Sequence, residues 1–448
     1  MPIIWVMRKR KGSARATPVL PVVLSLMIVS SVGFLPAQSH RLTNLPPETD
    51  DVRRLHLDSA FAPLSQLDSF RSRVEISRES GRRVLVTTET NPEYRYVLFL
   101  PQARVEPEHE DAFPIASAGA YILRRRRADG EADQLKIFLH SDPGFFLRIR
   151  PDGTSRTMLT LYVAGVRVSH GIPLPVALGT LLTEPFARLM DMTRSRVDWS
   201  VIYPDTTNPA YQDVALVAGR TRDVLHTLHD ADDGAMDEHG DLVFIDTLGS
   251  QEGRGGFNCS GFAKWIIDGV HQGLHGSLLP IAPLKTKHLD IRGHRWTETL
   301  EETRDPYFGL DWTRNLATAA LSAQRNGDAV HPQAADVRSV AYHAYVRNVG
   351  YRVDRLALIM YLLAISEPGH FYLGSVNPEF GDDPPLKQHV HVVVLFPYFD
   401  EGGRFVVDVM ERNVETSLAS LDRRYHNDSI HLVRVRASRS YEPPVIRH

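Results

Sequence analysis

Cysteine is almost absent from this chain, whose 448 residues include only one. A single cysteine excludes a disulfide within the chain and any zinc site built from several thiolates. The chain also lacks an excess of charge, with a net charge of -3, which argues against a protein held on nucleic acid by a broad positive field. Its hydrophobic content of 43% is ordinary for a folded protein, and its length suggests two or three domains.

The N-terminus has the pattern of an export signal. Four cationic residues at 8–11 precede an uncharged apolar run from Pro18 to Ala37, which is the order found in secretory signals. The run is also about long enough, at roughly 20 residues, to span a bilayer. We therefore assign 1–37 to a signal peptide or an N-terminal anchor and expect an exported protein, periplasmic or associated with the cell envelope. In an oxidising compartment an unpaired thiol is a liability unless it is buried or used.

The rest of the chain divides into a β-rich part and a mixed part. Residues 38–70 are polar and predict a linker. Residues 71–175 contain short runs of β-branched and aromatic residues between turn signals, which predicts a small antiparallel sandwich or barrel. Residues 176–204 predict a helical connector. In 205–440 helices come first and sequential strands follow, which is typical of an α+β domain.

Local patterns place the elements of the mixed part more closely. Apolar spacing predicts helices at 214–229, 258–272, 333–348 and 353–365. After the turn signal at Pro368 and Gly369, runs of β-branched and aromatic residues predict strands at 370–376, 389–399, 403–411 and 430–438.

The single cysteine lies at the start of one predicted helix. Glycines precede it, and Asn258 is a preferred N-cap residue. At a helix start the macrodipole and the free backbone N–H groups lower the pKa of a thiol. The same N–H groups can stabilise the oxyanion of an attacked carbonyl, and Gly261 would leave room for a substrate backbone. Cys259 is therefore our candidate nucleophile.

A cysteine nucleophile needs a histidine base and a polar group that orients the imidazole. His391 stands at the head of an apolar strand, and Asp408 interrupts the next strand. A buried carboxylate requires a partner, so we predict that His391 is the base and that Asp408 orients it. His389 is the alternative base, because residues two apart on a strand share a face. Glu411 is the alternative orienting residue.

These residues resemble the catalytic motif of the NlpC-type cell-wall cysteine peptidases, a compact papain-like family. The resemblance covers about 205–440 discontinuously and rests on the segments Cys259-Ser260-Gly261-Phe262, Pro368-Gly369-His370-Phe371, His391-Val392-Val393-Val394-Leu395-Phe396 and Ile430-His431-Leu432-Val433-Arg434-Val435-Arg436, with Asp408 at the third catalytic position. The chain departs from the family at Asn258 and His370, where the family has Asp, and at Val393, where it has Gly. The insertion at about 273–367 is also longer than the family's connection.

The resemblance implies a papain-like α+β domain in which the helix bearing Cys259 packs on an antiparallel sheet. It implies an exported cysteine hydrolase that cleaves amide bonds in peptidoglycan peptides by a Cys259–His391–Asp408 mechanism, with no cofactor and no nucleic-acid partner. The β-rich part would then be a targeting or wall-binding module. Two alternatives stay open: a catalytically inactive envelope protein that binds wall material or a protein partner, and a transamidase or acyltransferase that uses the same Cys–His pair. The His-x-His spacing of His389 and His391 also occurs in metal sites, but no third ligand of clear spacing accompanies it, so we expect no metal.

Overall fold

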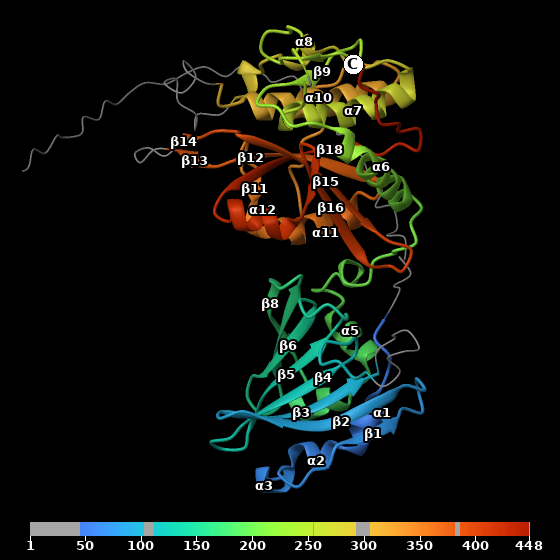
Figure 1. The fold of residues 1–448 in the computed structure, drawn as a ribbon. Coiled ribbons are helices and arrows are strands. Elements are labelled where there is room, and N and C mark those ends of the chain that lie inside the picture. The colour runs from blue at the N-terminus through green and yellow to red at the C-terminus, as the bar shows by residue number, and fades with distance from the viewer. Residues whose placement is uncertain (1–44, 103–111, 254, 293–304, 381–385, 448) are drawn as a thin grey trace, which may run out of the picture. The chain divides into compact units, whose positions relative to one another are not determined.

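The computed structural model describes residues 45–102, 112–253, 255–292, 305–380 and 386–447 (Figure 1). The segment 1–37, predicted as a signal or an anchor, lies outside these residues. Within the described ranges no helix is both long and apolar enough to cross a membrane.

An eight-stranded antiparallel sheet follows the first short helices. Its strands pair in sequence order and are β1 (Arg73–Ile76), β2 (Arg83–Thr90), β3 (Tyr94–Pro101), β4 (Tyr121–Arg126), β5 (Ala132–Phe138), β6 (Phe146–Pro151), β7 (Thr157–Val163) and β8 (Val166–Leu174). Burial alternates along β4 and β6 because successive side chains point to opposite faces. The predicted antiparallel β structure is confirmed. The predicted sandwich is not, because all eight strands belong to one sheet.

The predicted linker at 38–70 is wrong over most of its length. It contains α1 (Asp50–Leu55), α2 (Leu57–Phe61) and α3 (Leu64–Leu67). Arg53 is only 1% exposed and donates hydrogen bonds to the carbonyl oxygens of Leu182 and Glu184. Its guanidinium also lies 3.8 Å from the ring centroid of Tyr121. Some of the polar side chains that suggested a linker are therefore buried, and their hydrogen bonds offset the cost of burying them.

Helices are present in the predicted helical connector at 176–204. It contains α4 (Leu178–Thr183), α5 (Phe186–Thr193) and the 3-10 helix η2 (Trp199–Val201). Leu181 and Leu182 of α4 are buried in the same hydrophobic core as the inward-facing residues of the eight-stranded sheet.

The C-terminal part contains a six-stranded antiparallel sheet with helices on both faces (Figure 1). Its strands, in spatial order, are β11 (Tyr351–Arg352), β18 (Ser429–Arg436), β12 (His370–Asn377), β15 (His391–Phe399), β16 (Phe405–Glu411) and β17 (Val414–Thr416). Two further short pairs are β9 (Ala235–Met236) with β10 (Leu242–Val243), and β13 (Glu379–Phe380) with β14 (Leu386–Lys387). The α+β prediction and all four predicted strands are confirmed.

The helices of this part divide between the two faces of the sheet. One hydrophobic core against the sheet includes residues of α6 (Ala210–Val224), α7 (Cys259–His275) and α10 (Phe308–Gln324). A second hydrophobic core includes residues of α11 (Leu356–Ser366) and α12 (Leu418–Tyr425). The shorter helices are η3 (Leu225–Thr227), α8 (Ile281–Leu284), η4 (Leu289–Ile291) and η5 (Val353–Arg355). Helices are thus confirmed near three of the four predicted positions.

The predicted helix at 333–348 is absent. The segment instead runs beside β18, with the N–H of Val337 donating to the carbonyl of Leu432 and the N–H of Arg434 donating to that of Ala335. The remainder of the segment consists of turns and isolated bridges, with Tyr342 and Asn348 at positive φ, so a continuous helix cannot form there. Conversely, α10 was not predicted. Its buried side includes Arg314, so the apolar repeat of a helix is interrupted in its sequence.

Candidate functional site

The start of α7 has the geometry expected of a capped helix. Asn258 is the N-cap, and its Oδ1 accepts a hydrogen bond of 2.8 Å from the backbone N–H of Gly261. No carbonyl of the same helix can reach the N–H groups of Cys259 and Ser260, since the first turn of a helix leaves its donors free. Cys259 is partly exposed, whereas Ser260 is buried. The thiol is therefore held at the positive end of α7 and remains accessible.

Gly261 is required for close packing. A Cβ at this position would overlap the carbonyl oxygen of Gly234 and press on the backbone of Ala235. The same carbonyl accepts a hydrogen bond from the N–H of Asn258. Gly261 therefore lets α7 approach the loop before β9. The expectation that it leaves room for a substrate backbone is replaced by this packing role.

His391 connects the thiol to a carboxylate. It is the first residue of β15, and it lies close enough to Cys259 for each side chain to shift the pKa of the other. Its Nε2 lies 2.6 Å from Oε2 of Glu411, the last residue of β16. The structure thus brings together the predicted nucleophile, the predicted base and the alternative orienting residue in one chain of contacts.

The electrostatics of this cluster favour separated charges. Burial opposes the charged form of His391, but its hydrogen bonds to Cys259 and Glu411 outweigh that and raise its pKa to about 9. Burial alone would raise the pKa of Cys259, yet the net effect of His391 lowers it. For Glu411, burial is outweighed by His391 and Arg424, which lower its pKa to about 2. These directions favour the charged form of each group: thiolate at Cys259, imidazolium at His391 and carboxylate at Glu411.

Asp408 does not contact this cluster. One of its oxygens lies 2.9 Å from Nη2 of Arg222, and the other accepts a hydrogen bond of 2.9 Å from the hydroxyl of Tyr398. It is partly buried and partnered, as expected, but its partner is an arginine. The prediction that Asp408 orients His391 is therefore wrong, and Glu411 takes that position.

The register of the β15–β16 hairpin explains the exchange. Leu395 lies directly opposite Val409, so these two side chains share a face of the sheet. His391 and Glu411 are separated from them by even numbers of residues and lie on the same face, because the side-chain repeat of a strand is two. Asp408 is one residue from Val409 and therefore faces the other way.

His389, the alternative base, is a buried structural residue. It lies before β15 rather than within it, so the expectation that it shares a strand face with His391 is wrong. Its Nδ1 lies 2.8 Å from the hydroxyl of Ser375, and its Nε2 lies 3.1 Å from the carbonyl oxygen of Asn348. Burial holds its pKa well below the ordinary value. His389 is therefore held neutral and engaged at both nitrogens.

Three residues that we did not predict support the cluster. Oε1 of Glu411 accepts a hydrogen bond of 2.5 Å from the hydroxyl of Thr416 and another of 2.5 Å from Nη2 of Arg424. The ring of Tyr425 stacks on that of His391 at a centroid distance of 6.2 Å and an interplanar angle of 22°. Arg424 and Tyr425 end α12, and no motif or spacing in the sequence ties that helix to Cys259.

One further cation lies on the rim of the site. Arg412 follows Glu411 in the turn between β16 and β17, and its Nη1 lies 2.6 Å from a carboxylate oxygen of Asp230. Its charge contributes to the lowered pKa of Cys259. Its φ of 55° is a conformation that non-glycine residues adopt at a cost. Arg412 therefore adds to the positive field around the thiol.

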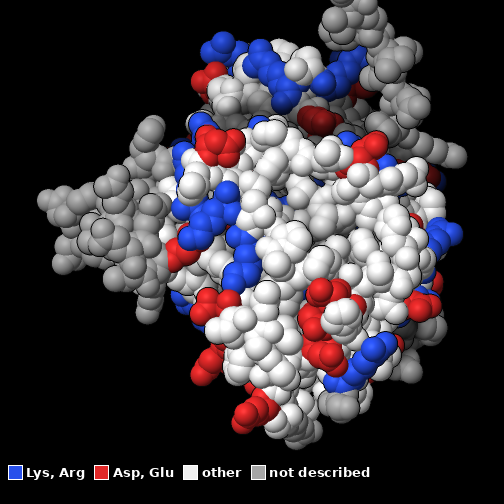
Figure 2. All heavy atoms as spheres, turned by 90° about the horizontal axis from the view of Figure 1, so that it is seen from above, with Lys and Arg blue, Asp and Glu red and all other residues white. Residues whose placement is uncertain are grey.

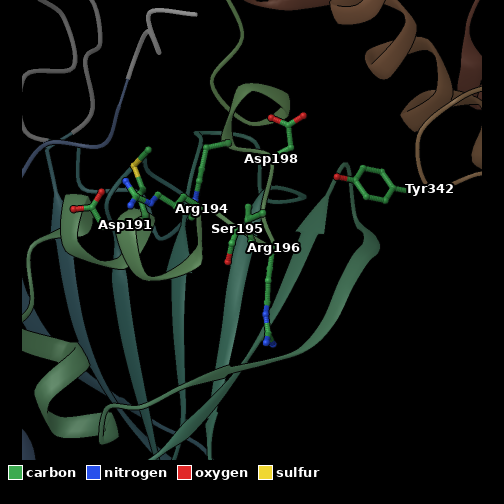
Figure 3. Close-up of a pocket in the computed structure, with 9 residues that line it drawn as sticks. Asp191, Arg194, Ser195, Arg196, Asp198 and Tyr342 are labelled. Carbon is green, nitrogen blue, oxygen red and sulfur yellow. The ribbon is translucent and has the colours of Figure 1, made fainter. Parts of the chain in front are cut away.

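Other features of the described residues do not supply a competing site. No group of three or more His, Cys, Asp or Glu side chains within them is placed to hold a metal ion. A hollow of about 630 Å³ is lined by residues 190–191, 194–199 and Tyr342 and includes none of the cluster residues. Figure 3 shows that its labelled side chains point in different directions, which does not resemble a catalytic arrangement.

The structure defines a mixed α/β protein with two large antiparallel sheets and a Cys–His–Glu cluster. Residues 44–201 match the model of a family described as a domain of unknown function (DUF8515). This match spans α1–α3, the eight-stranded sheet, and α4 and α5, and it ends before the residues of the cluster. No curated protein and no solved structure matches the chain.

Proposed function

We propose that this protein is a cysteine hydrolase that cleaves amide bonds through Cys259, His391 and Glu411. The observation that carries the proposal is the position of His391, whose Nε2 lies 2.6 Å from Oε2 of Glu411 and which is near enough to Cys259 for the two groups to shift each other's pKa. This is the arrangement in which a base accepts and returns a proton while a third group fixes its ring.

The chemistry follows from these contacts. The thiolate of Cys259 attacks the carbonyl carbon, and the backbone N–H groups at the start of α7 stabilise the resulting oxyanion. The imidazolium of His391 protonates the leaving amine, which breaks the C–N bond and leaves a thioester. His391 then accepts a proton from water as the water attacks the thioester, and the C–S bond breaks, which releases the acid product and restores the thiolate of Cys259. Glu411 keeps the imidazole oriented throughout.

The substrate class is proposed from the resemblance to the NlpC-type cell-wall peptidases and from the predicted export signal. Both favour peptide bonds of peptidoglycan outside the cytoplasmic membrane. The departures from the family leave the cluster intact, which favours an active enzyme over an inactive binding protein. Asn258 caps α7, and the ring of His370 hydrogen-bonds to the carbonyl of Glu367.

The reactivity of the thiol tests the proposal without a known substrate. Because Cys259 is the only cysteine, iodoacetamide labelling followed by intact mass reports on this site alone. We expect rapid labelling at pH 7, and slower labelling in His391→Gln, since the loss of the imidazolium raises the pKa of the thiol. Equal labelling rates in the two proteins would contradict the pairing of Cys259 with His391.

Product release tests the reaction itself. We expect purified protein to release peptide fragments from peptidoglycan and Cys259→Ala to release none. Undiminished release by Cys259→Ala would refute the catalytic role of this residue. An added amine that appears in the product in place of water would favour the transamidase alternative.

A further inference from the structure

Within the described residues, a row of cations without ion-pair partners lies on the outward face of the eight-stranded sheet. Seen from above in Figure 2, basic and acidic side chains are mixed among uncharged ones. The outward face of β5 and β6 is different. The outward side chains there belong to Lys136, Arg148 and Arg150. They alternate along β5 and β6 with inward side chains such as Ile137, which is 1% exposed, and Ile149, which is 0% exposed. We call Lys136, Arg148 and Arg150 the cationic row.

Two members of the cationic row face each other directly. Lys136 lies opposite Arg148 in the β5–β6 register. Like charges directly opposite each other destabilise a sheet. Arg124 nearby is paired with Asp133. No carboxylate among the described residues forms an ion pair with a member of the cationic row.

Neighbouring aromatic rings position these cations but leave their charge in place. Nζ of Lys136 lies 3.9 Å from the ring centroid of Phe146, and the guanidinium of Arg148 lies 5.1 Å from that of Tyr162. Nε of Arg148 is buried and has no hydrogen-bond partner among the described residues. A cation over a ring gains about 0.5–2 kcal/mol, yet a buried donor without an acceptor is costly. Among the described residues, the row therefore has cationic side chains held in place by aromatic rings and no carboxylate partner.

The surroundings indicate what kind of acceptor fits. Gln134 lies on the same face as Lys136, two residues along β5, and adds a neutral group that can hydrogen-bond to hydroxyls. A hollow of about 540 Å³ borders the row at Arg150, and its lining includes Arg124 and Arg126 as well as the carboxylates of Glu131 and Asp133. The cations of the row suit carboxylates, whereas Gln134 and the mixed lining of the hollow suit hydroxyls, so together they fit an extended polymer that carries both.

We infer that the cationic row binds an acidic polysaccharide. Phe146 and Tyr162 stack on each other, with centroids 4.4 Å apart and an interplanar angle of 12°. Their facing planes are therefore occupied, which disfavours the stacking of nucleic-acid bases. The inference does not depend on the cysteine site, because all of these residues lie in the eight-stranded sheet.

Binding of polygalacturonate to the full-length protein, measured by microscale thermophoresis at 50 and 200 mM NaCl, tests the inference. We expect binding that weakens at the higher salt concentration, since the contacts are ionic. Neutral dextran should not bind. The double variant Lys136→Gln/Arg148→Gln should bind at least about tenfold more weakly, because it loses two charge-assisted contacts. Arg156→Gln is the matched control, since Arg156 is exposed and already paired with Asp152.

Further measurements separate binding from folding. Arg150→Gln removes an exposed cation, so it should fold normally and bind about threefold more weakly. Lys136→Gln should unfold within about 3 °C of the natural protein, because the relief of two opposed charges offsets the loss of the contact with the Phe146 ring. The inference is overturned if polygalacturonate does not bind at 50 mM NaCl. It is also overturned if the folded double variant binds unchanged, or if single-stranded poly(dT) binds as tightly as polygalacturonate.

Discussion

Nε2 of His391 lies 2.6 Å from Oε2 of Glu411, and the two side chains come from neighbouring antiparallel strands. A carboxylate at this distance fixes the tautomer and the orientation of the imidazole and stabilises its protonated form. The contact therefore makes His391 a better partner for a thiolate, and it assigns Glu411 rather than Asp408 to the third position of the proposed triad.

Glu411→Gln should reduce turnover of a peptidoglycan peptide by about 10²-fold or more, because the imidazolium loses its partner. The apparent pKa of Cys259, measured from iodoacetamide labelling against pH, should rise. Asp408→Asn is the matched control and should leave both quantities unchanged, since Asp408 contacts Arg222 and Tyr398 instead. The reverse pattern would restore Asp408 as the orienting residue.

Arg424→Met should lower kcat by about tenfold with little change in KM, because Arg424 positions the carboxylate of Glu411 without touching the substrate. Arg424→Lys should recover part of the loss. A matched control is Arg423→Met in the same helix, where the side chain is exposed. Steady-state kinetics and the pH profile of labelling check this prediction, and equal behaviour of the Arg423 and Arg424 variants would contradict it.

Asn258→Asp should move the midpoint of Cys259 labelling against pH upward by about one unit, because a carboxylate beside a thiolate raises the pKa of the thiol. Stability should hold, since Asp caps helices as well as Asn does. Asn258→Ala should instead lower the free energy of unfolding by about 1 kcal/mol through loss of the cap. Faster labelling in Asn258→Asp would show that the helix end tolerates a second negative charge.

Gly261→Ala should lower the free energy of unfolding by about 3 kcal/mol, because the added methyl group overlaps the backbone at Gly234. Gly219→Ala is the control: Gly219 lies within α6, and an added Cβ there meets no atom within 4 Å. It should raise the free energy of unfolding by about 0.5–1 kcal/mol, since alanine is the better helix former. Urea unfolding measures both, and a mild effect at Gly261 would mean that α7 can shift.

Acid should remove the stability that Glu411 provides. Its pKa is lowered to about 2 in the folded protein against an ordinary value of 4.5, so its contribution is present above pH 4.5 and disappears as the pH falls towards 2. The free energy of unfolding should exceed that of Glu411→Gln by about 3 kcal/mol at pH 7, and by progressively less as the pH falls below 4.5. Urea unfolding at pH 7, 5 and 3 tests this, and a difference that is constant with pH would contradict it.

Local sequence signals located most of the C-terminal fold. The apolar run at 391–399 predicts β15, and the apolar spacing after Asn258 predicts α7, because each pattern follows the geometry of its own element. The same reasoning predicted a helix at 333–348 that is absent, and it missed α10. The segment 333–348 hydrogen-bonds to the distant strand β18. In α10, Arg314 interrupts the apolar repeat because it forms a buried ion pair with Asp336. Neither partner is visible from neighbouring residues.

The sequence by itself determined that the single cysteine begins a capped helix and that a histidine heads a following strand. Both follow from local backbone preferences, and both appear in the structure. Only the tertiary structure decided which carboxylate meets His391. Asp408 and Glu411 are three residues apart on one strand, and the register of the hairpin turns Glu411 towards the histidine. Strand register depends on pairing with another segment, so the orienting residue of the candidate site was set by the fold.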